Sequence, residues 1–178
     1  VSEPERQNKS APQYRRIWYR DSADAKWEKI AECETIGGVC MVGDSFSPLA
    51  FDYDNSTLYV SSNAGRDKAA IYKYDTKTRK LGELVYENPL MDVSNAGDLV
   101  FSRPLKKLVG IRVDADKPRF KWLDPDLDKL QQQLDATYPK TFNYMTLPSD
   151  SQNKALIYAV SDTDPGMYLL LDRVKPSI

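Results

Sequence analysis

The sequence predicts an all-β fold: a partial β-propeller of about three to three and a half antiparallel blades, with one inserted helix near 125–138. Three observations predict it. A short run that ends in aspartate recurs along the chain, a second apolar run precedes it with nearly the same period, and turn-forming residues separate the short strands. Short strands with turn signals every ten residues or so indicate antiparallel sheet.

The aspartate that ends each run fixes the period. The runs are IWYRD, IYKYD, FKWLD and YLLLD, and their aspartates are Asp21, Asp75, Asp124 and Asp172. The last three aspartates are 49 and 48 residues apart, and the runs LYVSS, LVGIR and LIYAV begin 50 and 48 residues apart. At the first position of a turn, each carboxylate is expected to accept the backbone N–H two residues on and so to end the third strand of its blade.

Each repeat unit is predicted to consist of three or four consecutive strands. The expected first strands are LAFDYD (49–54), DLVFSR (98–103) and FNYMTL (142–147), and the fourth strand of the first full unit is KLGELVYEN (80–88). Turns are expected between the second and third strands at 63–68, 114–118 and 162–166. RRIWYRD and AKWEKIAECE (25–34) are typical of the outer half of a preceding blade.

The segment DPDLDKLQQQLDATYP (124–139) predicts a helix instead of a fourth strand. Asp124 can cap it, and Pro125 suits its first turn. An apolar stripe at helical spacing, which predicts a face that packs against the blades, is formed by Leu127, Leu130, Leu134 and Tyr138.

The length of 178 residues predicts one domain over 14–178, after a disordered or extended segment over 1–13. Its blade units are expected at about 14–45, 46–94, 95–140 and 141–178. Closed propellers use four to eight blades, so the chain is expected to be part of one. The open faces of its end blades are then expected to self-associate.

The sequence contains no histidine, which excludes a Ser-His-Asp triad, a Cys-His dyad and a His-ligated metal site within these residues. The patterns GxSxG and GxGxxG and the P-loop are also absent. We therefore expect no catalytic residue, no cofactor and no metal in this chain. With 25 basic and 26 acidic residues and no long apolar run, we also expect no nucleic-acid or membrane partner.

The two cysteines, Cys33 and Cys40, lie in CETIGGVC. This spacing does not fit a CxxC redox or zinc site, and two thiolates without histidine cannot complete a tetrahedral metal shell. Two alternatives stay open at this point: a pair of partly buried thiols, or a local disulfide in an oxidising compartment.

Three stretches carry a resemblance to a known family: RRIWYRDSADAKWEKIAE, FSPLAFDYDNSTLYVSSNAGRDKAAIYKYD and SDTDPGMYLLLDR. They resemble the N-terminal propeller of bacterial members of the prolyl oligopeptidase family, the dipeptidyl aminopeptidase or acylaminoacyl-peptidase-like serine peptidases, over most of 15–175. The resemblance implies that an α/β-hydrolase domain with a Ser-Asp-His triad follows the propeller and hydrolyses short peptides. This chain would then be a non-catalytic propeller fragment that limits access to the active site and helps to shape it.

No catalytic residue is carried over by this resemblance. It makes Arg66 and Asp67 in NAGRDK, and Asp162 and Asp164 in SDTDPG, candidates for contact with the substrate. The alternative for these four residues is that they form turns and are solvated or pair with one another.

A second functional hypothesis is a stand-alone propeller module that binds a peptide or protein and has no enzymatic partner domain. The gene region after Ile178 distinguishes the two hypotheses, because a hydrolase domain there would carry GxSxG. The chain begins at Val1 and shows no signal peptide in its present residues, which suggests processing or excision. The resemblance favours a periplasmic or secreted location over a cytoplasmic one.

Overall fold

The computed structural model describes residues 13–36, 39–42, 44–93, 98–114, 118–148, 151 and 153–174. The chain divides into two compact units, residues 1–96 and 97–178, each of which is described by itself. The expected segment 1–13 lies outside the described residues except for Gln13. The expected domain over 14–178 and its blade boundaries stay predictions.

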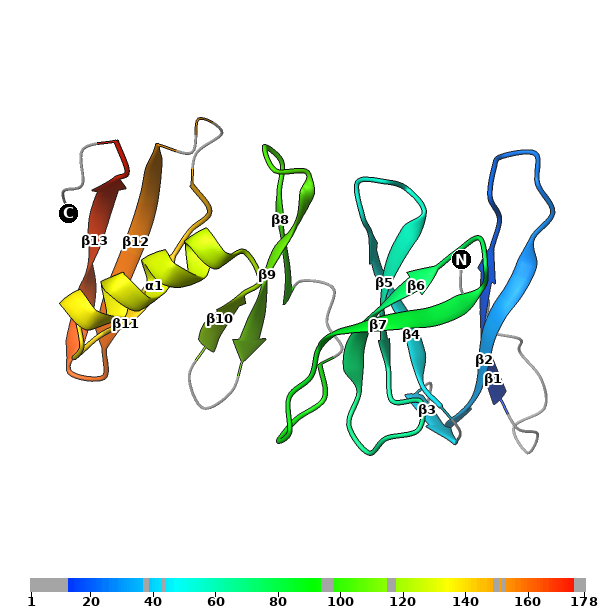
Figure 1. Cartoon of the computed structure of the whole chain (residues 1–178). Helices are drawn as coiled ribbons and strands as arrows, with labels where there is room; N and C mark the ends of the chain where they lie inside the picture. The colour runs from blue at the N-terminus through cyan, green and yellow to red at the C-terminus, as the bar shows by residue number, and fades with distance from the viewer. Residues whose placement is uncertain are drawn as a thin grey trace. The chain divides into compact units, whose positions relative to one another are not determined.

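The first unit contains two antiparallel sheets (Figure 1). One sheet has three strands and the other has four. In both sheets, strands that follow each other in sequence lie next to each other. The strands of the first are β1 (Gln13–Tyr19), β2 (Glu28–Ile36) and β3 (Val39–Val42), and those of the second are β4 (Phe46–Phe51), β5 (Thr57–Ser62), β6 (Ala70–Asp75) and β7 (Lys80–Tyr86).

The core of the first unit lies on the central strands of its four-stranded sheet. Leu58 and Val60 on β5 and Tyr74 on β6 are buried together, and Ile30 of β2 packs against them. Side chains in a strand alternate between the two faces, so Leu58 and Val60 share one face of β5. The apolar run LYVSS therefore provides the core strand of this sheet.

Arg79, in the turn between β6 and β7, binds the three-stranded sheet of the same unit. Its Nη2 lies 3.4 Å from Asp21 Oδ2 and 3.0 Å from Glu28 Oε2. Its guanidinium lies over the ring of Tyr19, 4.6 Å from the ring centroid. One cation thus links the turn of one sheet to the β1–β2 hairpin of the other.

Cys33 and Cys40 form a disulfide between β2 and β3, with their Cα atoms 5.6 Å apart. Of the two alternatives that the sequence leaves open, the structure contains the disulfide. It crosslinks the strand pair in which Thr35 lies opposite Cys40.

The second unit contains two three-stranded antiparallel sheets and one helix (Figure 1). Their strand orders are β10-β9-β8 and β11-β12-β13. The elements are β8 (Leu99–Ser102), β9 (Lys107–Asp114), β10 (Pro118–Trp122), α1 (Pro125–Thr137), β11 (Phe142–Met145), β12 (Lys154–Ser161) and β13 (Asp164–Asp172).

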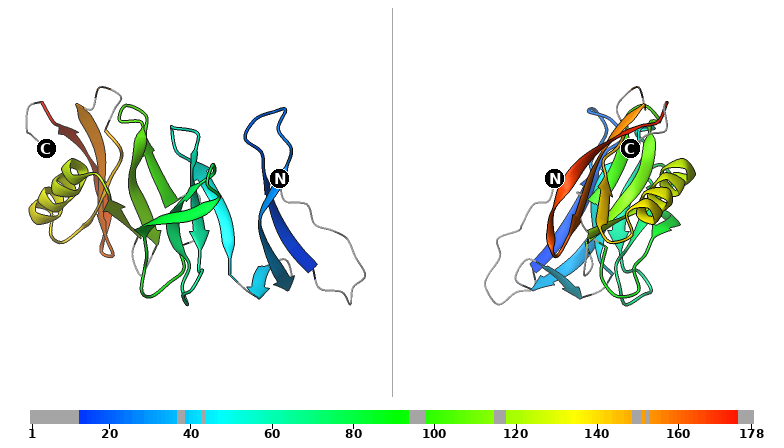
Figure 2. Two further views of the ribbon diagram at one scale, coloured as in Figure 1. Left: turned by 45° about the vertical axis from the view of Figure 1, so that its right-hand side comes forward. Right: turned by 90° about the vertical axis from the view of Figure 1, so that its left-hand side faces the viewer.

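Helix α1 joins the two sheets of this unit through one core, and Figure 2 shows it beside the sheet β11-β12-β13 in both views. Leu127 and Leu134 are buried, and Leu130 and Tyr138 are partly buried against the same cluster. The expected packing face of the helix is therefore confirmed. The buried residues of the cluster are Val109, Trp122, Leu127, Leu134, Met145, Ala155, Ile157 and Leu171.

The start of α1 follows from its cap. Asp124 is extended, with φ −83° and ψ 123°, and its carboxylate accepts the N–H groups of Asp126 and Leu127. Burial raises the pKa of Asp124, but its hydrogen bond to Lys107 and those to the two backbone N–H groups outweigh burial and hold the pKa below its ordinary value. Lys107 Nζ lies 2.7 Å from Asp124 Oδ2.

The hydrogen bond expected of the recurring aspartates is present at three of the four positions. The Oδ1 atoms of Asp75, Asp124 and Asp172 accept the backbone N–H two residues on, at 2.8, 3.1 and 2.9 Å. At the fourth, Asp21, the contact described is the ion pair with Arg79. A common role of the four residues in a blade repeat stays a prediction.

The expected all-β fold is confirmed, because the described residues form four antiparallel sheets and one helix. Among these residues no sheet closes on itself. The expected strand 80–88 is present as β7, Lys80–Tyr86. The turn expected at 162–166 is shorter, because β13 already begins at Asp164, opposite Ser161. Gly166 has φ 94°, and its N–H donates to Asp164 Oδ1. This conformation allows β13 to pair with β12 from Asp164 onwards.

The carboxylate of Asp54 stabilises the turn between β4 and β5. Asp54 Oδ1 accepts the N–H groups of Ser56 and Thr57, both at 2.8 Å, and its Oδ2 accepts the Thr57 hydroxyl at 2.7 Å. Asn55 between them has φ 55°, a conformation that asparagine tolerates better than most residues. The hydroxyl of Thr57 and these N–H groups lower the pKa of Asp54 to about 2.

We predict that Leu134→Ala lowers the free energy of unfolding by about 2–5 kcal/mol, because it leaves a cavity where α1 meets the core. Leu134 is 2% exposed. Urea denaturation measures the change. The control is Lys129→Ala on the exposed side of α1, for which we expect a change within about 0.5 kcal/mol. Equal effects of the two variants would contradict the described packing.

We predict that the stability difference between the wild type and Asp54→Asn depends on pH. The folded pKa of about 2 lies below the unfolded value of about 3.9, so the ionised carboxylate stabilises the fold above about pH 4. This contribution is lost as the pH falls from about 4 to about 2. Urea denaturation near pH 7 and near pH 2 should therefore show the difference shrinking in acid.

The control for this titration is Asp67→Asn, because the Asp67 side chain is 88% exposed. We expect little difference from the wild type at either pH. A difference for Asp54→Asn that stays the same at both pH values would show that the carboxylate does not carry the effect.

Candidate functional site

Arg66 lies in the connection between β5 and β6, where its backbone N–H donates to Asn63 O at 2.9 Å. Its Nη1 donates to the Tyr72 hydroxyl at 3.2 Å, and its Nη2 pairs with Glu87. The hydrogen bond to Tyr72 and the pair with Glu87 raise the pKa of Arg66. Two groups of the same unit thus orient the guanidinium, whose Nε is buried without a hydrogen-bond partner.

Asp67 forms an exposed ion pair with its neighbour in sequence. Its Oδ2 lies 3.1 Å from Lys68 Nζ, and its side chain is 88% exposed. An ion pair in this environment contributes little to stability. The structure therefore leaves Asp67 accessible to solvent beside a neighbouring cation.

Asp162 and Asp164 lie in the hairpin between β12 and β13. Asp164 Oδ1 accepts the N–H of Gly166 at 2.9 Å, and the Tyr158 hydroxyl donates to Pro165 O at 2.8 Å. Asp162 is an exposed residue of the two-residue turn. The carboxylate of Asp164 thus stabilises the hairpin, as expected of a turn-forming residue.

The structure places the four candidates in two different units. Arg66 and Asp67 are neighbours in the first unit, and Asp162 and Asp164 are in the second. Arg66, Asp67 and Asp162 lie in the connection from the second strand of a sheet to the third, and Asp164 is the first residue of the third strand, β13. Contact of any of them with a substrate stays a proposal.

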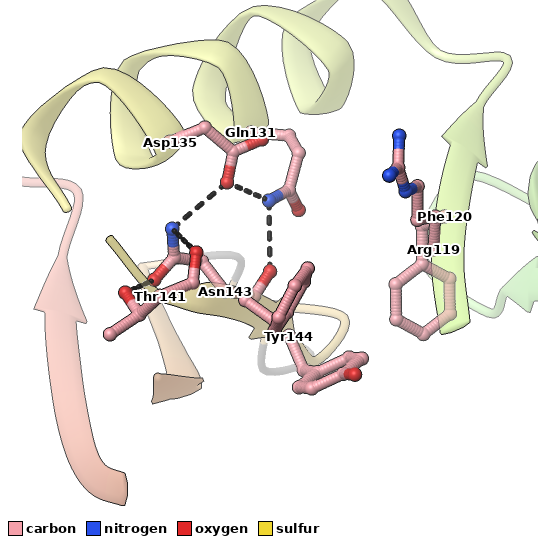
Figure 3. Close-up of a pocket in the computed structure, with 8 residues that line it drawn as sticks. Arg119, Phe120, Gln131, Asp135, Thr141, Asn143 and Tyr144 are labelled. Atoms are coloured by element: carbon pink, nitrogen blue, oxygen red, sulfur yellow. Dashed lines mark hydrogen bonds between the residues drawn. The ribbon is translucent and has the colours of Figure 1, made fainter. Parts of the chain in front are cut away.

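A hollow of about 250 Å³ lies within the second unit, between α1, β10 and β11 (Figure 3). Its lining combines three aromatic rings, one cation, one carboxylate and three polar uncharged side chains. The lining residues are Arg119, Phe120, Gln131, Asp135, Thr141, Phe142, Asn143 and Tyr144.

The wall beneath α1 is a hydrogen-bonded group of polar side chains (Figure 3). Asp135 Oδ1 accepts from Gln131 Nε2 and from Asn143 Nδ2, both at 3.0 Å. Gln131 Nε2 also donates to Asn143 O at 2.9 Å, and Trp122 Nε1 donates to Gln131 Oε1 at 3.3 Å. These bonds fix the two amides and one carboxylate oxygen, so this wall is preorganised.

Asn143 connects this wall to the end of the helix. It is buried at 7% exposure, and its Nδ2 donates to Tyr138 O at 3.1 Å as well as to Asp135. The Thr141 hydroxyl donates to Asn143 Oδ1 at 2.8 Å. The polar atoms of this buried amide are thereby satisfied, as buried polar groups require.

The opposite side of the hollow comes from β10 and β11. Figure 3 shows Arg119 beside β10, across the hollow from Asp135, with the rings of Phe120 and Tyr144 on the side away from the helix. Arg119 forms no ion pair or side-chain hydrogen bond with another described residue. Its guanidinium is therefore available to a ligand.

The sequence interpretation did not identify this hollow. Besides the apolar stripe, the helix carries a polar pair, Gln131 and Asp135, which the interpretation did not use. Their i, i+4 spacing places both side chains on the same face of the helix. That spacing was the available signal. The approach of Arg119 and Tyr144 to this face depends on packing between elements and leaves no local pattern.

Among the described residues, no group of three or more Cys, Asp or Glu side chains is arranged to hold a metal ion. No helix in the same part of the chain is long and apolar enough to cross a membrane.

Comparison with known proteins gives one informative similarity. Over 154 residues the chain is 25% identical to dipeptidyl aminopeptidase BIII of Pseudoxanthomonas mexicana. The aligned region covers 86% of this chain and 21% of that peptidase, so the chain spans about a fifth of the length of its relative. The similarity suggests a related peptidase family.

No protein-family model matches the chain. No solved structure matches it significantly.

Proposed function

We propose that this chain forms part of the β-propeller of a serine peptidase that hydrolyses short peptides. The observation that carries the proposal is the succession of four antiparallel sheets along the chain, in which each strand pairs with its neighbour in sequence. Consecutive meanders of this kind are the building units of propellers. The similarity to dipeptidyl aminopeptidase BIII supports the assignment to a peptidase.

In this proposal the chain is not itself catalytic. A C-terminal α/β-hydrolase domain in the parent chain supplies the Ser-Asp-His triad, and the propeller limits access to it and helps to shape the site. The absence of histidine from the sequence agrees with a supporting role for these residues. The partners are then the hydrolase domain and short peptide substrates.

The test of the proposed function begins with the parent gene. Its product is expected to contain GxSxG, then Asp and His, within about 250–300 residues after residue 178, the size of one hydrolase domain. The purified parent protein should cleave chromogenic dipeptide and tripeptide substrates, and the 178-residue chain alone should not. A parent protein that ends at Ile178 would contradict the proposal and favour a stand-alone binding module.

We predict that Arg66→Ala in the parent protein lowers kcat/KM for a short peptide by about tenfold, because it removes a charge-assisted hydrogen bond to the substrate. Steady-state kinetics measure the effect. The matched control is Lys73→Ala, which breaks the exposed ion pair with Glu83 at 2.7 Å. An unchanged kcat/KM for Arg66→Ala in an active peptidase would exclude the substrate contact and leave the peptidase assignment intact.

We further propose that open blade faces self-associate. On one face of the sheet β11-β12-β13, Leu156 lies opposite Leu170 and Tyr158 opposite Tyr168. Leu156, Leu170 and Tyr168 are 43%, 57% and 71% exposed. A contiguous apolar face of this kind is typical of a surface that another chain or domain covers.

We predict that the isolated chain associates with rising concentration in sedimentation velocity experiments. The double variant Tyr168→Lys, Leu170→Lys should remain monomeric, because it places two charges in the contact. Leu90→Lys is the control, since Leu90 is 82% exposed and lies in the other unit. A wild-type chain that stays monomeric at millimolar concentration would contradict this proposal.

A further inference from the structure

Strand β10 has a strand partner on one side only. In the sheet order β10-β9-β8 it is an outer strand, so its other edge faces no strand among the described residues. In the first unit the equivalent third strand, β6, pairs on that side with β7. Helix α1 follows β10 in place of such a strand. An outer strand of this kind offers backbone N–H and C=O groups to an added extended peptide.

The hollow beneath α1 opens beside this strand. Arg119 and Phe120 come from β10, and Phe142 and Tyr144 come from β11, the outer strand of the neighbouring sheet. The rings of Phe120, Phe142 and Tyr144 line a volume of about 250 Å³. Aromatic walls favour an aromatic side chain, since rings gain from stacked or edge-to-face contact as well as from burial.

The charges of the hollow favour a carboxylate at Arg119. Asp135, on the opposite side, already has its Oδ1 bound to the amides of Gln131 and Asn143. Arg119 is exposed and forms no ion pair with a described residue. A guanidinium binds a carboxylate with two parallel N–H bonds, which gives this contact a defined direction.

We propose that the hollow binds the C-terminus of an extended peptide that ends in an aromatic residue. The terminal carboxylate pairs with Arg119, and the ring enters the space lined by Phe120, Phe142 and Tyr144. The backbone of the peptide adds to the edge of β10 that has no strand partner among the described residues. A peptide is favoured over a small aromatic acid because only a peptide uses that edge. The site depends on the lining of the hollow and on the outer position of β10, so it does not rest on the proposed peptidase function.

Isothermal titration calorimetry of the 178-residue chain tests the site with four probes: Ala-Ala-Phe, its C-terminal amide, Ala-Ala-Ala and 3-phenylpropionate. We expect Ala-Ala-Phe to bind most tightly. The amide, which lacks the negative charge, should bind about fivefold more weakly, as expected for one exposed but bidentate ion pair. Ala-Ala-Ala and 3-phenylpropionate, which lack the ring and the peptide backbone respectively, should also bind more weakly.

The variant Arg119→Gln should remove the preference for the free acid over the amide, so that both peptides bind with equal affinity. Its matched control is Lys121→Gln, which removes the same charge from an exposed position of β10 that does not line the hollow. Lys121→Gln should keep the fivefold preference. Circular dichroism of both variants checks that the fold is unchanged.

Three outcomes would overturn the proposal. Equal binding of acid and amide by the wild type would exclude the contact with Arg119, and equal binding of Ala-Ala-Ala would exclude the aromatic space. Binding of 3-phenylpropionate as tight as that of Ala-Ala-Phe would exclude the use of the β10 edge and indicate a site for small aromatic acids.

Discussion

An aspartate carboxylate turns the chain at or just after the third strand of three of the four sheets. At Asp75, Asp124 and Asp172 one oxygen accepts the backbone N–H two residues on, which favours a turn. Strands β6 and β13 end at Asp75 and Asp172, and β10 ends at Trp122, two residues before Asp124. After Asp75 the chain returns as a fourth strand, because KLGELVYEN has the composition and length of a strand. After Asp124 the same bond caps a helix, because proline and leucines at helical spacing follow it. The same hydrogen bond thus precedes a strand in one unit and a helix in the other, and that helix, α1, forms one wall of the hollow.

Elements with a local pattern were predictable from the sequence. The strands around LYVSS, LVGIR and LIYAV and the helix from Pro125 lie close to their expected positions, because alternation and helical spacing are properties of a few neighbouring residues. The turn at 162–166 was expected to be longer, since Asp, Pro and Gly are ordinary turn residues. The positive φ of Gly166 and its bond to Asp164 instead allow these residues to pair as part of β13.

Contacts between distant residues were not predictable in the same way. The pair of Arg66 with Glu87, the reach of Arg79 to Glu28 and the hollow at Arg119 all join side chains that no short spacing connects. The choice between thiols and a disulfide for Cys33 and Cys40 depended on the pairing of β2 with β3. For the four candidate residues, the sequence therefore predicted that they lie in or beside turns. It could not predict which of their charged groups pair with other side chains, because that depends on packing.

Described charged groups of the two units cap turns and link strands, and the second unit presents a guanidinium beside aromatic rings and an exposed apolar sheet face. That the chain is part of a propeller that serves a peptidase is our proposal, which the similarity to dipeptidyl aminopeptidase BIII supports. The crystal structure of the parent protein tests the propeller proposal. In that structure we expect the four sheets to lie as consecutive blades around one axis, next to an α/β-hydrolase domain. Sheets without a common axis, or a parent protein without that domain, would contradict it.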